Sequence, residues 1–265
     1  KMKIIIFCLI GFFVFQPIFA QSPYKLSWQK DGIIGCTNLA VVLTAPMVVD
    51  NIKPLTESKI ANLSKNDLNW FDRSAVNNYS ENLANASDVL LASIMLSPAG
   101  FIFFEDMRED YFILGTMYME TSLLAIFIPS YAKGGVKRIR PYVYNPDVSL
   151  EKKTKSDARE SFFSRHTTVA FSSAVFFSSV YSAYFPNSEY EKYIWGGSLL
   201  LATTIGFLRY ESGEHFPTDI ITGAAVGSAI GYLIPYFHKR ENPVNIGFHP
   251  AGNNSDYYLT LHFQF

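Results

Sequence analysis

The chain consists of apolar stretches that alternate with polar segments. Six stretches are dominated by apolar residues, and each has about the length of a bilayer-spanning helix, roughly 20 residues. They cover residues 33–49, 86–104, 111–130, 167–185, 193–208 and 220–237. This pattern predicts an all-α fold, a membrane-embedded helical bundle of about six helices.

Small residues recur within the apolar stretches. In the last of them Gly223, Gly227 and Gly231 follow one another at intervals of four, so they share one face of a helix. Small residues on one face let two membrane helices approach closely, and we expect a helix–helix contact there. The Ser, Thr and Gly content also lowers the hydropathy, which leaves a soluble domain with buried helices as the alternative.

The first 20 residues are typical of a secretory signal peptide. Lys1 and Lys3 form a short basic start, an apolar run follows at residues 4–15, and Ala20 precedes Gln21. An uncleaved first membrane helix is the alternative interpretation. If the segment is removed, Cys36 is the single cysteine that remains, so we expect no disulfide framework.

The tail has a different periodicity from the rest of the chain. Apolar residues alternate with others in residues 244–248 and again in residues 257–265, and turn-forming residues fill 250–256. Alternation of this kind predicts two strands, and the turn between them predicts a β-hairpin. We therefore divide the chain into a signal peptide (1–20), an apolar segment with a polar linker (21–85), a helical bundle (86–240) and a β-like C-terminal tail (241–265).

Charge is balanced overall but concentrated locally. The formal net charge of −1 gives no support for nucleic-acid binding. In residues 131–166, however, nine Lys and Arg residues stand against four acids. A basic loop of this kind is typical of the cytoplasmic side of a membrane protein, or it forms a surface that binds anions.

Three short polar clusters lie at the ends of apolar stretches. In the first, Lys133 is followed after six residues by Arg140 and a proline; the second covers residues 161–167. In the third, Arg209, His215 and Asp219 are separated by five and then three residues. Each cluster alone is a weak signal, but the three in this order, separated by helices, indicate one site.

The residue types of these clusters point to phosphate. Lys133, Arg140 and Arg209 supply three cations, and the two guanidinium groups bind phosphate oxygens in a bidentate way. Ser164 and His166 lie just before a predicted helix, whose free N–H groups and positive dipole end favour an anion.

The third cluster adds a nucleophile to the phosphate site. A carboxylate on one ring nitrogen of His215 leaves the other nitrogen free to attack, and Asp219 has the spacing to supply it. His166 is placed to protonate the leaving oxygen. His215 and Asp219 have no third ligand at a suitable spacing, so we expect no metal.

Together the clusters resemble the type 2 phosphatidic acid phosphatase family, which includes bacterial acid phosphatases, lipid phosphate phosphatases and vanadium haloperoxidases. The family pattern is a lysine six residues before Arg-Pro, then Pro-Ser-Gly-His, then Ser-Arg with a histidine and an aspartate at the spacing found here. The resemblance covers about residues 86–237. It implies a phosphatase that needs no metal or other cofactor.

The resemblance also implies a role for each matching residue. It assigns phosphate binding to four residues: Lys133, Arg140, Ser164 and Arg209. It makes His215 the nucleophile, Asp219 the residue that orients it, and His166 the general acid.

Three positions depart from the family pattern. Phe163 replaces the usual proline, Arg165 the usual glycine, and Leu208 a frequent serine. The glycine matters most, because its backbone approaches an anion closely. Arg165 adds a fourth cation, suited to a second phosphate; alternatively it pairs with an acid such as Glu160 and shapes the loop.

Other polar residues are expected to be structural or solvated. Glu120, within an apolar stretch, is either functional or satisfied by a partner in the bundle. Glu211 and Glu214 are expected to be solvated loop acids. Three histidines lie outside the motifs: His238, His249 and His262.

We therefore expect a phosphatase that hydrolyses a phosphomonoester or diphosphate of a membrane lipid through a phosphohistidine intermediate. Undecaprenyl pyrophosphate, lipid A, phosphatidylglycerol phosphate and phosphatidic acid all fit the site chemistry. One alternative is a haloperoxidase-like enzyme in which vanadate occupies the phosphate site. The other is a membrane scaffold protein with a decayed site.

The expected location is the bacterial cell envelope, in the inner membrane, with the active site facing the periplasm as in the family. The expected partners are the phosphorylated lipid and the membrane. One conflict remains in this topology: three spans separate Gln21 from Lys133. If Gln21 is exported, either one stretch does not span or the site faces the cytoplasm.

Overall fold

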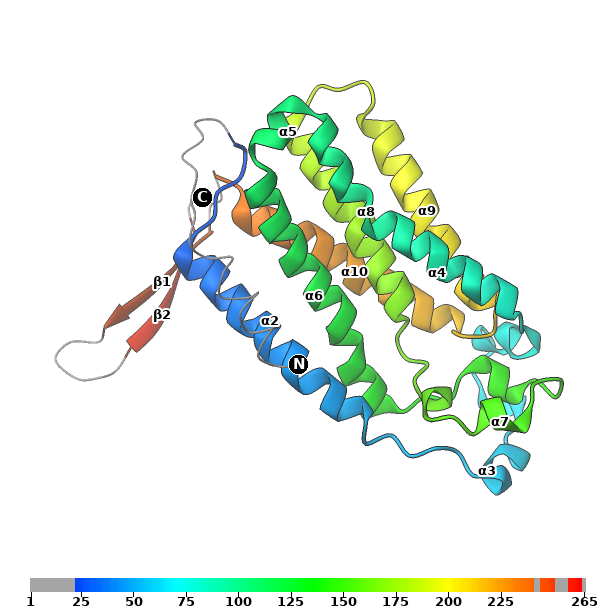
Figure 1. The fold of residues 1–265 in the computed structure, drawn as a ribbon. Coiled ribbons are helices and arrows are strands. Elements are labelled where there is room, and N and C mark those ends of the chain that lie inside the picture. Colours follow the sequence, from blue (N-terminus) through cyan, green and yellow to red (C-terminus); the bar gives the residue numbers. More distant parts are fainter. Residues whose placement is uncertain (1–21, 241–243, 251–256, 264–265) are drawn as a thin grey trace.

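The computed structural model describes residues 22–240, 244–250 and 257–263, so the predicted signal peptide lies outside the described residues. Long helices account for most of the fold (Figure 1). They are α2 (Trp28–Val49), α4 (Glu81–Met95), α6 (Tyr111–Val136), α8 (Arg165–Tyr184), α9 (Glu191–Glu211) and α10 (Pro217–His238). These six helices confirm the all-α bundle predicted from the apolar stretches.

Short helical elements connect the long helices. They are α3 (Glu57–Ala61), η2 (Lys65–Asp67), η3 (Asp72–Asn77), η4 (Ser97–Phe103), α5 (Glu105–Glu109), η5 (Pro141–Tyr144), α7 (Leu150–Lys153) and η6 (Ser156–Arg159). Several helices begin directly after a hydroxyl residue whose side chain accepts a backbone N–H of the first turn: Thr56, Ser80, Ser149 and Ser164. These caps satisfy amide groups that have no partner within the helix.

The long helices run alternately in opposite directions along the bundle. α2, α6 and α9 run toward the end that carries α3 and α7, whereas α4, α8 and α10 run away from it (Figure 1). α8 is central and packs against α4, α6, α9 and α10, while α2 packs against α6. The apolar core between them includes Met117, Phe176, Val180 and Ile234.

The glycine face of α10 lies directly against α8. A Cβ atom added at Gly223, Gly227 or Gly231 would lie 2.7, 2.2 or 2.4 Å from a backbone carbonyl oxygen of α8 or of its N-cap residue. No side chain fits at such distances, so the two backbones approach as closely as the helix geometry allows. The helix–helix contact predicted from the four-residue spacing is confirmed.

Among the described residues, four helical segments are long and apolar enough to cross a membrane: α2, Glu81–Phe103, Tyr111–Tyr144 and α10. Within the described part of the chain, α8 and α9 do not reach that standard, although we expected both to span. α8 carries many buried Ser and Thr side chains, and a helix enclosed by other helices need not be apolar. The chain is a membrane protein whose central helix is comparatively polar.

The residues before α2 lie beside the end of α10. The N–H of Lys25 donates to the carbonyl of His238, and the N–H of Arg240 donates to that of Pro23, both at 2.9 Å. α2, α4 and α6 each run the length of the bundle, so this end is opposite the end of α6. If all three helices cross the membrane, Gln21 and Lys133 lie on opposite sides of it. An exported Gln21 would then place Lys133 on the cytoplasmic side.

Two strands follow the bundle where the alternation in the sequence predicts them. β1 (Val244–Pro250) and β2 (Tyr257–Phe263) pair antiparallel, with Val244 opposite Phe263 and Pro250 opposite Tyr257. The hairpin projects from the end of the bundle where α10 stops (Figure 1).

Candidate active site

The three sequence clusters meet at the end of the bundle that carries α3 and α7 (Figure 1). Lys133 lies in the last turn of α6, and Arg140 follows shortly after that helix. Ser164 is the N-cap of α8, Arg209 lies in the last turn of α9, and His215 precedes α10. Because α6 and α9 end where α8 and α10 begin, residues far apart in sequence share one site.

His215 is buried and faces Asp219. The side chain of His215 is 2 % exposed, and its Nδ1 lies 3.6 Å from Oδ2 of Asp219. Nδ1 has no hydrogen-bond partner among the described residues. Asp219 Oδ2 accepts hydrogen bonds from the Ser161 hydroxyl and from the N–H of Phe216. The imidazole therefore faces the carboxylate slightly beyond hydrogen-bond distance.

The turn between α9 and α10 fixes the backbone of His215. Gly213 has φ +73°, a conformation that favours glycine, and a Cβ there would lie 2.1 Å from the carbonyl oxygen of Asn78. The N–H of His215 donates to the carbonyl of Arg209 at 3.2 Å, and the N–H of Tyr142 donates to the carbonyl of Gly213 at 2.9 Å. These contacts tie the histidine to the end of α9 and to η5.

Arg138 holds Asp219 from the other side, and the sequence analysis did not identify it as a site residue. Its Nη1 donates to Oδ1 of Asp219 and its Nη2 to Oδ2 of Asp72, both at 2.6 Å. The guanidinium also lies over the ring of Phe216, 4.2 Å from its centroid. Both carboxylates are fully buried. Arg138 thus pairs with two buried acids and fixes the orientation of Asp219.

His166, in the first turn of α8, contacts an acid from α4. Its Nε2 lies 2.7 Å from Oδ1 of Asp88. Nη1 of Arg209 lies 3.6 Å from the same oxygen and donates to the Ser87 hydroxyl at 3.2 Å. Asp88 therefore connects the candidate general acid with a candidate phosphate ligand. The sequence analysis missed Asp88 because no motif marks its position in α4.

Glu214 is buried, and the prediction that it is a solvated loop acid is wrong. The residue is only 8 % exposed. Its Oε2 pairs with Nη1 of Arg140 and lies 3.2 Å from Nη2 of Arg209. Nζ of Lys152 lies 3.8 Å from the other carboxylate oxygen. An internal anion is thus held between the two guanidinium groups that we expected to bind phosphate.

The remaining cations line the α6 side of the site. Lys133 is 3 % exposed, and its Nζ lies 3.9 Å from Oε2 of Glu160. Arg165 donates from Nη2 to the Ser130 hydroxyl at 3.1 Å, so its partner in this structure is a residue of α6. Glu160, the acid we considered for Arg165, pairs with Lys133 instead.

Ser164 links the start of α8 to the start of α10. Its hydroxyl accepts hydrogen bonds from the N–H and the hydroxyl of Thr167, at 3.3 and 2.9 Å. Its N–H donates to the carbonyl of Asp219 at 3.1 Å. The second and third sequence clusters are therefore joined through their backbones.

Both histidines are electrostatically disposed to be neutral at pH 7. Burial, followed by the positive charges of Arg140, Lys133 and Arg209, holds the pKa of His215 well below its usual value. Burial and the charge of Arg209 lower the pKa of His166 to about 4, against the raising effect of its bond to Asp88. A neutral His215 has a lone pair available for attack on an electrophile.

Residues 114–243 match the family model described as the PAP2 superfamily. This part of the chain belongs to the PAP2 superfamily. The matched residues contain all three clusters, and the resemblance inferred from the motifs is confirmed. Asp72, Ser87 and Asp88 precede the PAP2 segment, so η3 and α4 contribute contacts to the site from outside it.

A curated relative of this chain is the lipid A 4'-phosphatase of Porphyromonas gingivalis. It is 31 % identical over 139 residues, which is 51 % of this chain and 55 % of that protein. The match therefore spans about half of the length of the relative.

Two solved PAP2 structures are similar at low identity. One is a transmembrane PAP2 type phosphatidylglycerolphosphate phosphatase from Bacillus subtilis, with a TM-score of 0.43 and 18 % identity over 77 % of this chain and 96 % of that one. The other is LpxE of Aquifex aeolicus, with a TM-score of 0.34 and 23 % identity over 60 % of this chain and 89 % of that one. At these scores neither likeness carries an argument about function.

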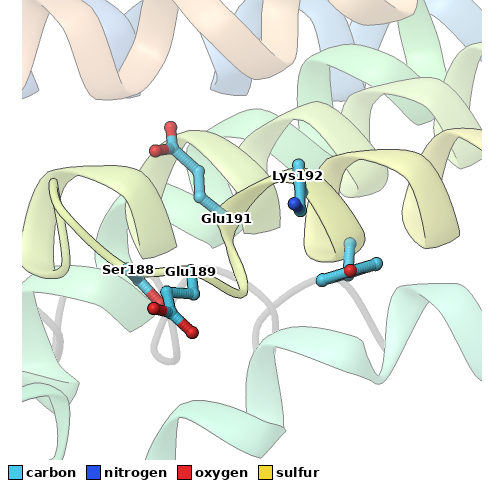
Figure 2. A pocket seen from close by; sticks show the side chains of 5 residues that line it. Ser188, Glu189, Glu191 and Lys192 are labelled. Atoms are coloured by element: carbon cyan, nitrogen blue, oxygen red, sulfur yellow. The ribbon is translucent and has the colours of Figure 1, made fainter.

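A surface pocket lies far from the PAP2 clusters, at the turn between α8 and α9 (Figure 2). It is lined by Ser188, Glu189, Glu191, Lys192 and Tyr193. Two carboxylates against one ammonium group make it unfavourable for phosphate. α8 and α9 turn there, at the end of the bundle opposite the start of α10 (Figure 1).

Proposed function

We propose that this protein is a membrane phosphatase that hydrolyses a phosphomonoester or diphosphate of a lipid through a phosphohistidine intermediate. The observation that carries the proposal is the meeting of a buried His215–Asp219 pair with a second histidine and a group of cations at one end of the bundle. The cations are Lys133, Arg140 and Arg209, joined by Arg165 at the start of α8.

The first proposed step forms a bond between His215 and phosphorus. Nε2 of His215 attacks, and the bond from phosphorus to the lipid oxygen breaks. His166, which takes up a proton when the phosphate dianion binds beside it, gives that proton to the lipid oxygen. Asp219 stabilises the positive charge that develops on the imidazole. The cations and the hydroxyl of Ser164 stabilise the charge on the transferring phosphoryl oxygens.

The second proposed step returns the enzyme to its starting state. A water molecule attacks phosphorus, the phosphorus–nitrogen bond breaks, and inorganic phosphate leaves. His166, now neutral, accepts the proton of the attacking water, as microscopic reversibility requires. Each cycle therefore consumes one water and leaves both histidines as they began.

For the substrate, we propose a lipid A-type phosphate. The support is the Porphyromonas gingivalis relative, which is named for hydrolysis of the lipid A 4'-phosphate and is 31 % identical over 139 residues. Undecaprenyl pyrophosphate, phosphatidylglycerol phosphate and phosphatidic acid are the competing substrates. Purified protein in detergent should release inorganic phosphate from lipid A with the highest kcat/KM of the four.

The decisive control is His215→Ala, which should lower turnover by roughly 10³-fold or more while the protein still inserts and remains folded. Unchanged hydrolysis by this variant would exclude the phosphohistidine mechanism. Bromide oxidation that depends on added vanadate, without phosphatase activity, would identify the haloperoxidase alternative. If the wild-type protein shows neither activity, the scaffold interpretation remains.

The proposed mechanism needs no metal at the site of phosphoryl transfer. Vanadate should inhibit, because it adopts the five-coordinate geometry that the cations favour. In short assays, a chelator should leave the rate of phosphate release per folded enzyme molecule unchanged. Loss of turnover that a divalent ion restores, without a change in the amount of folded protein, would contradict this mechanism.

We also propose that the protein resides in the bacterial inner membrane with the active site facing the periplasm. The test uses a Cys8→Ser, Cys36→Ser background with one new cysteine, either Lys155→Cys at the site end or Asn187→Cys at the opposite end. Both positions are exposed. An impermeant maleimide should label the first and not the second in intact cells. The reverse pattern would place the site in the cytoplasm.

A further inference from the structure

Three titratable side chains from different helices meet at the end of the bundle opposite His215. Asp31 lies in the first turn of α2, Glu120 in α6, and His238 at the end of α10. Their side chains are 5, 5 and 0 % exposed. One ligand atom from each residue lies within 4.8 Å of the other two. Ionisable groups buried in a membrane bundle are costly, so such a cluster indicates a function.

The hydrogen bond on one ring nitrogen of His238 leaves the other directed at the two acids. Nδ1 lies 2.8 Å from the carbonyl oxygen of Ile234, to which it donates. Nε2 lies 2.9 Å from Oδ1 of Asp31 and 3.4 Å from Oε2 of Glu120. A backbone acceptor on one nitrogen is the usual arrangement around a metal-ligating histidine, because it fixes the tautomer with a lone pair on the other.

Glu120 supplies an independent indication of a ligand. Its residue is 4 % exposed, and Oε2 has no hydrogen-bond partner among the described residues. The amide oxygen of Asn38 is also buried without such a partner, while its amide nitrogen donates to the backbone carbonyl of Glu120 at 3.3 Å. Buried oxygens are normally satisfied, so a bound cation explains why Glu120 is directed at His238.

The charge of the cluster also calls for a cation. With both carboxylates ionised and the imidazole neutral, the cluster would carry a charge of −2 in a buried position, which is unfavourable without compensation. The buried ammonium of Lys30 donates to the carbonyl of Phe237 at 3.0 Å, and within the described ranges it forms no ion pair with the cluster. A divalent ion would neutralise the site completely, whereas protonation of His238 would leave one negative charge.

We propose that Asp31, Glu120 and His238 form a binding site for a divalent transition-metal ion of the zinc class. Nitrogen and oxygen donors suit Zn²⁺, with metal–ligand bonds of about 2.0 Å. In a tetrahedral site such bonds place ligand atoms roughly 3.3 Å apart. The two distances from Nε2 of His238, 2.9 and 3.4 Å, are close to that spacing.

The ion would act on the bundle and not on the phosphate. His238 follows Asp219 by 19 residues along α10, which corresponds to about 28 Å of helix. The three ligands come from α2, α6 and α10, so the ion would cross-link helices that meet at this end. Binding should therefore raise the thermal midpoint of unfolding without entering the chemical step.

The test measures bound metal directly. The purified full chain is equilibrated with Zn²⁺, separated from unbound ion and analysed for zinc by mass spectrometry. We expect about one ion per chain, a decrease of at least about tenfold in Glu120→Gln and His238→Ala, and full occupancy in His215→Ala. Asp110→Asn is the matched control, because Asp110 is a buried acid at the same end, bonded to Tyr184 outside the cluster.

Two further readouts separate this site from accidental binding. Co²⁺ in place of zinc should give the strong visible absorption of a four-coordinate ion in the wild type and not in Glu120→Gln, which preserves the shape of the side chain. A chelator should lower the thermal midpoint of the wild type and leave that of Glu120→Gln unchanged. The proposal is wrong if the wild type retains no zinc, or if Glu120→Gln and His238→Ala retain as much as the wild type.

Discussion

Oε2 of Glu214 lies 3.2 Å from Nη2 of Arg209, and the same oxygen pairs with Arg140. A carboxylate therefore competes with phosphate for the two guanidinium groups that the proposed mechanism needs. Glu214→Gln removes the charge and keeps the shape, so inhibition by vanadate should become about tenfold stronger, equivalent to ~1.4 kcal/mol. The measurement is the vanadate inhibition constant of phosphate release.

Glu211→Gln is the control for this prediction, because Glu211 lies three residues earlier, at the end of α9. It should leave the inhibition constant unchanged. Weaker inhibition in Glu214→Gln would mean that Glu214 positions the two arginines and does not compete with the anion.

The sequence predicted the helices and the meeting of the three polar clusters because both depend on short-range patterns. Apolar stretches mark the helices, and the four-residue glycine spacing marks the contact between α10 and α8. The motif residues lie next to helix ends, so helices that end together bring the clusters together. The span count was wrong, because a central helix such as α8 has protein neighbours that accept its Ser and Thr side chains.

The contacts that the sequence missed join positions far apart along the chain. Arg138 and Asp72 are separated by 66 residues, and His166 and Asp88 by 78. No local spacing predicts such pairs, because tertiary packing alone brings η3 and α4 to the site. Glu214 was misjudged for a similar reason: its burial depends on two arginines from other elements.

Arg138 connects this missed network to the nucleophile. Arg138→Ala would leave two fully buried carboxylates without their cation, which we expect to cost ~2–3 kcal/mol. We take the low side of the range for buried pairs because the Arg138 side chain is 20 % exposed. The thermal midpoint and kcat should both fall, and Arg138→Lys should restore part of each. A normal kcat in Arg138→Ala would show that Asp219 needs no second support.

His166 should gain a proton when an anion binds. The pKa of His166 is lowered to about 4 by burial and by Arg209, and a dianion beside it favours the charged form and raises that pKa. Between the free and bound pKa values, binding therefore takes up a proton, and affinity increases as pH falls. Titration calorimetry with sulfate at pH 6, in two buffers of different ionisation enthalpy, measures this uptake.

His166→Gln keeps a polar group but cannot take up the proton, so it is the control for the calorimetry. We expect uptake in the wild type and a clear reduction in this variant. Equal uptake in both proteins would assign the proton to another group, such as His215, and would remove the support for His166 as the general acid.

The contact between α10 and α8 should tolerate no added carbon. In Gly227→Ala the new Cβ would lie 2.2 Å from the carbonyl oxygen of Thr168, and overpacking of this kind costs about 1–3 kcal/mol. The thermal midpoint in detergent should fall. Gly196→Ala is the control, since a Cβ there meets no atom within 4 Å and alanine favours a helix by up to ~1 kcal/mol. Equal midpoints for the two variants would contradict the close contact.

Arg165 is the departure from the family pattern with the clearest consequence for the substrate. Its Nη2 bonds Ser130 at 3.1 Å, and its Nε has no hydrogen-bond partner among the described residues. If Arg165 binds a second phosphate, Arg165→Gly should lower kcat/KM for undecaprenyl pyrophosphate roughly tenfold to a hundredfold more than for phosphatidic acid, the effect of one charge-assisted contact. Ser130→Ala removes the present partner of Arg165 and keeps the cation. It should not lower kcat/KM for undecaprenyl pyrophosphate relative to kcat/KM for phosphatidic acid. An equal loss on both substrates in Arg165→Gly would show that Arg165 supports the start of α8 and has no part in substrate choice.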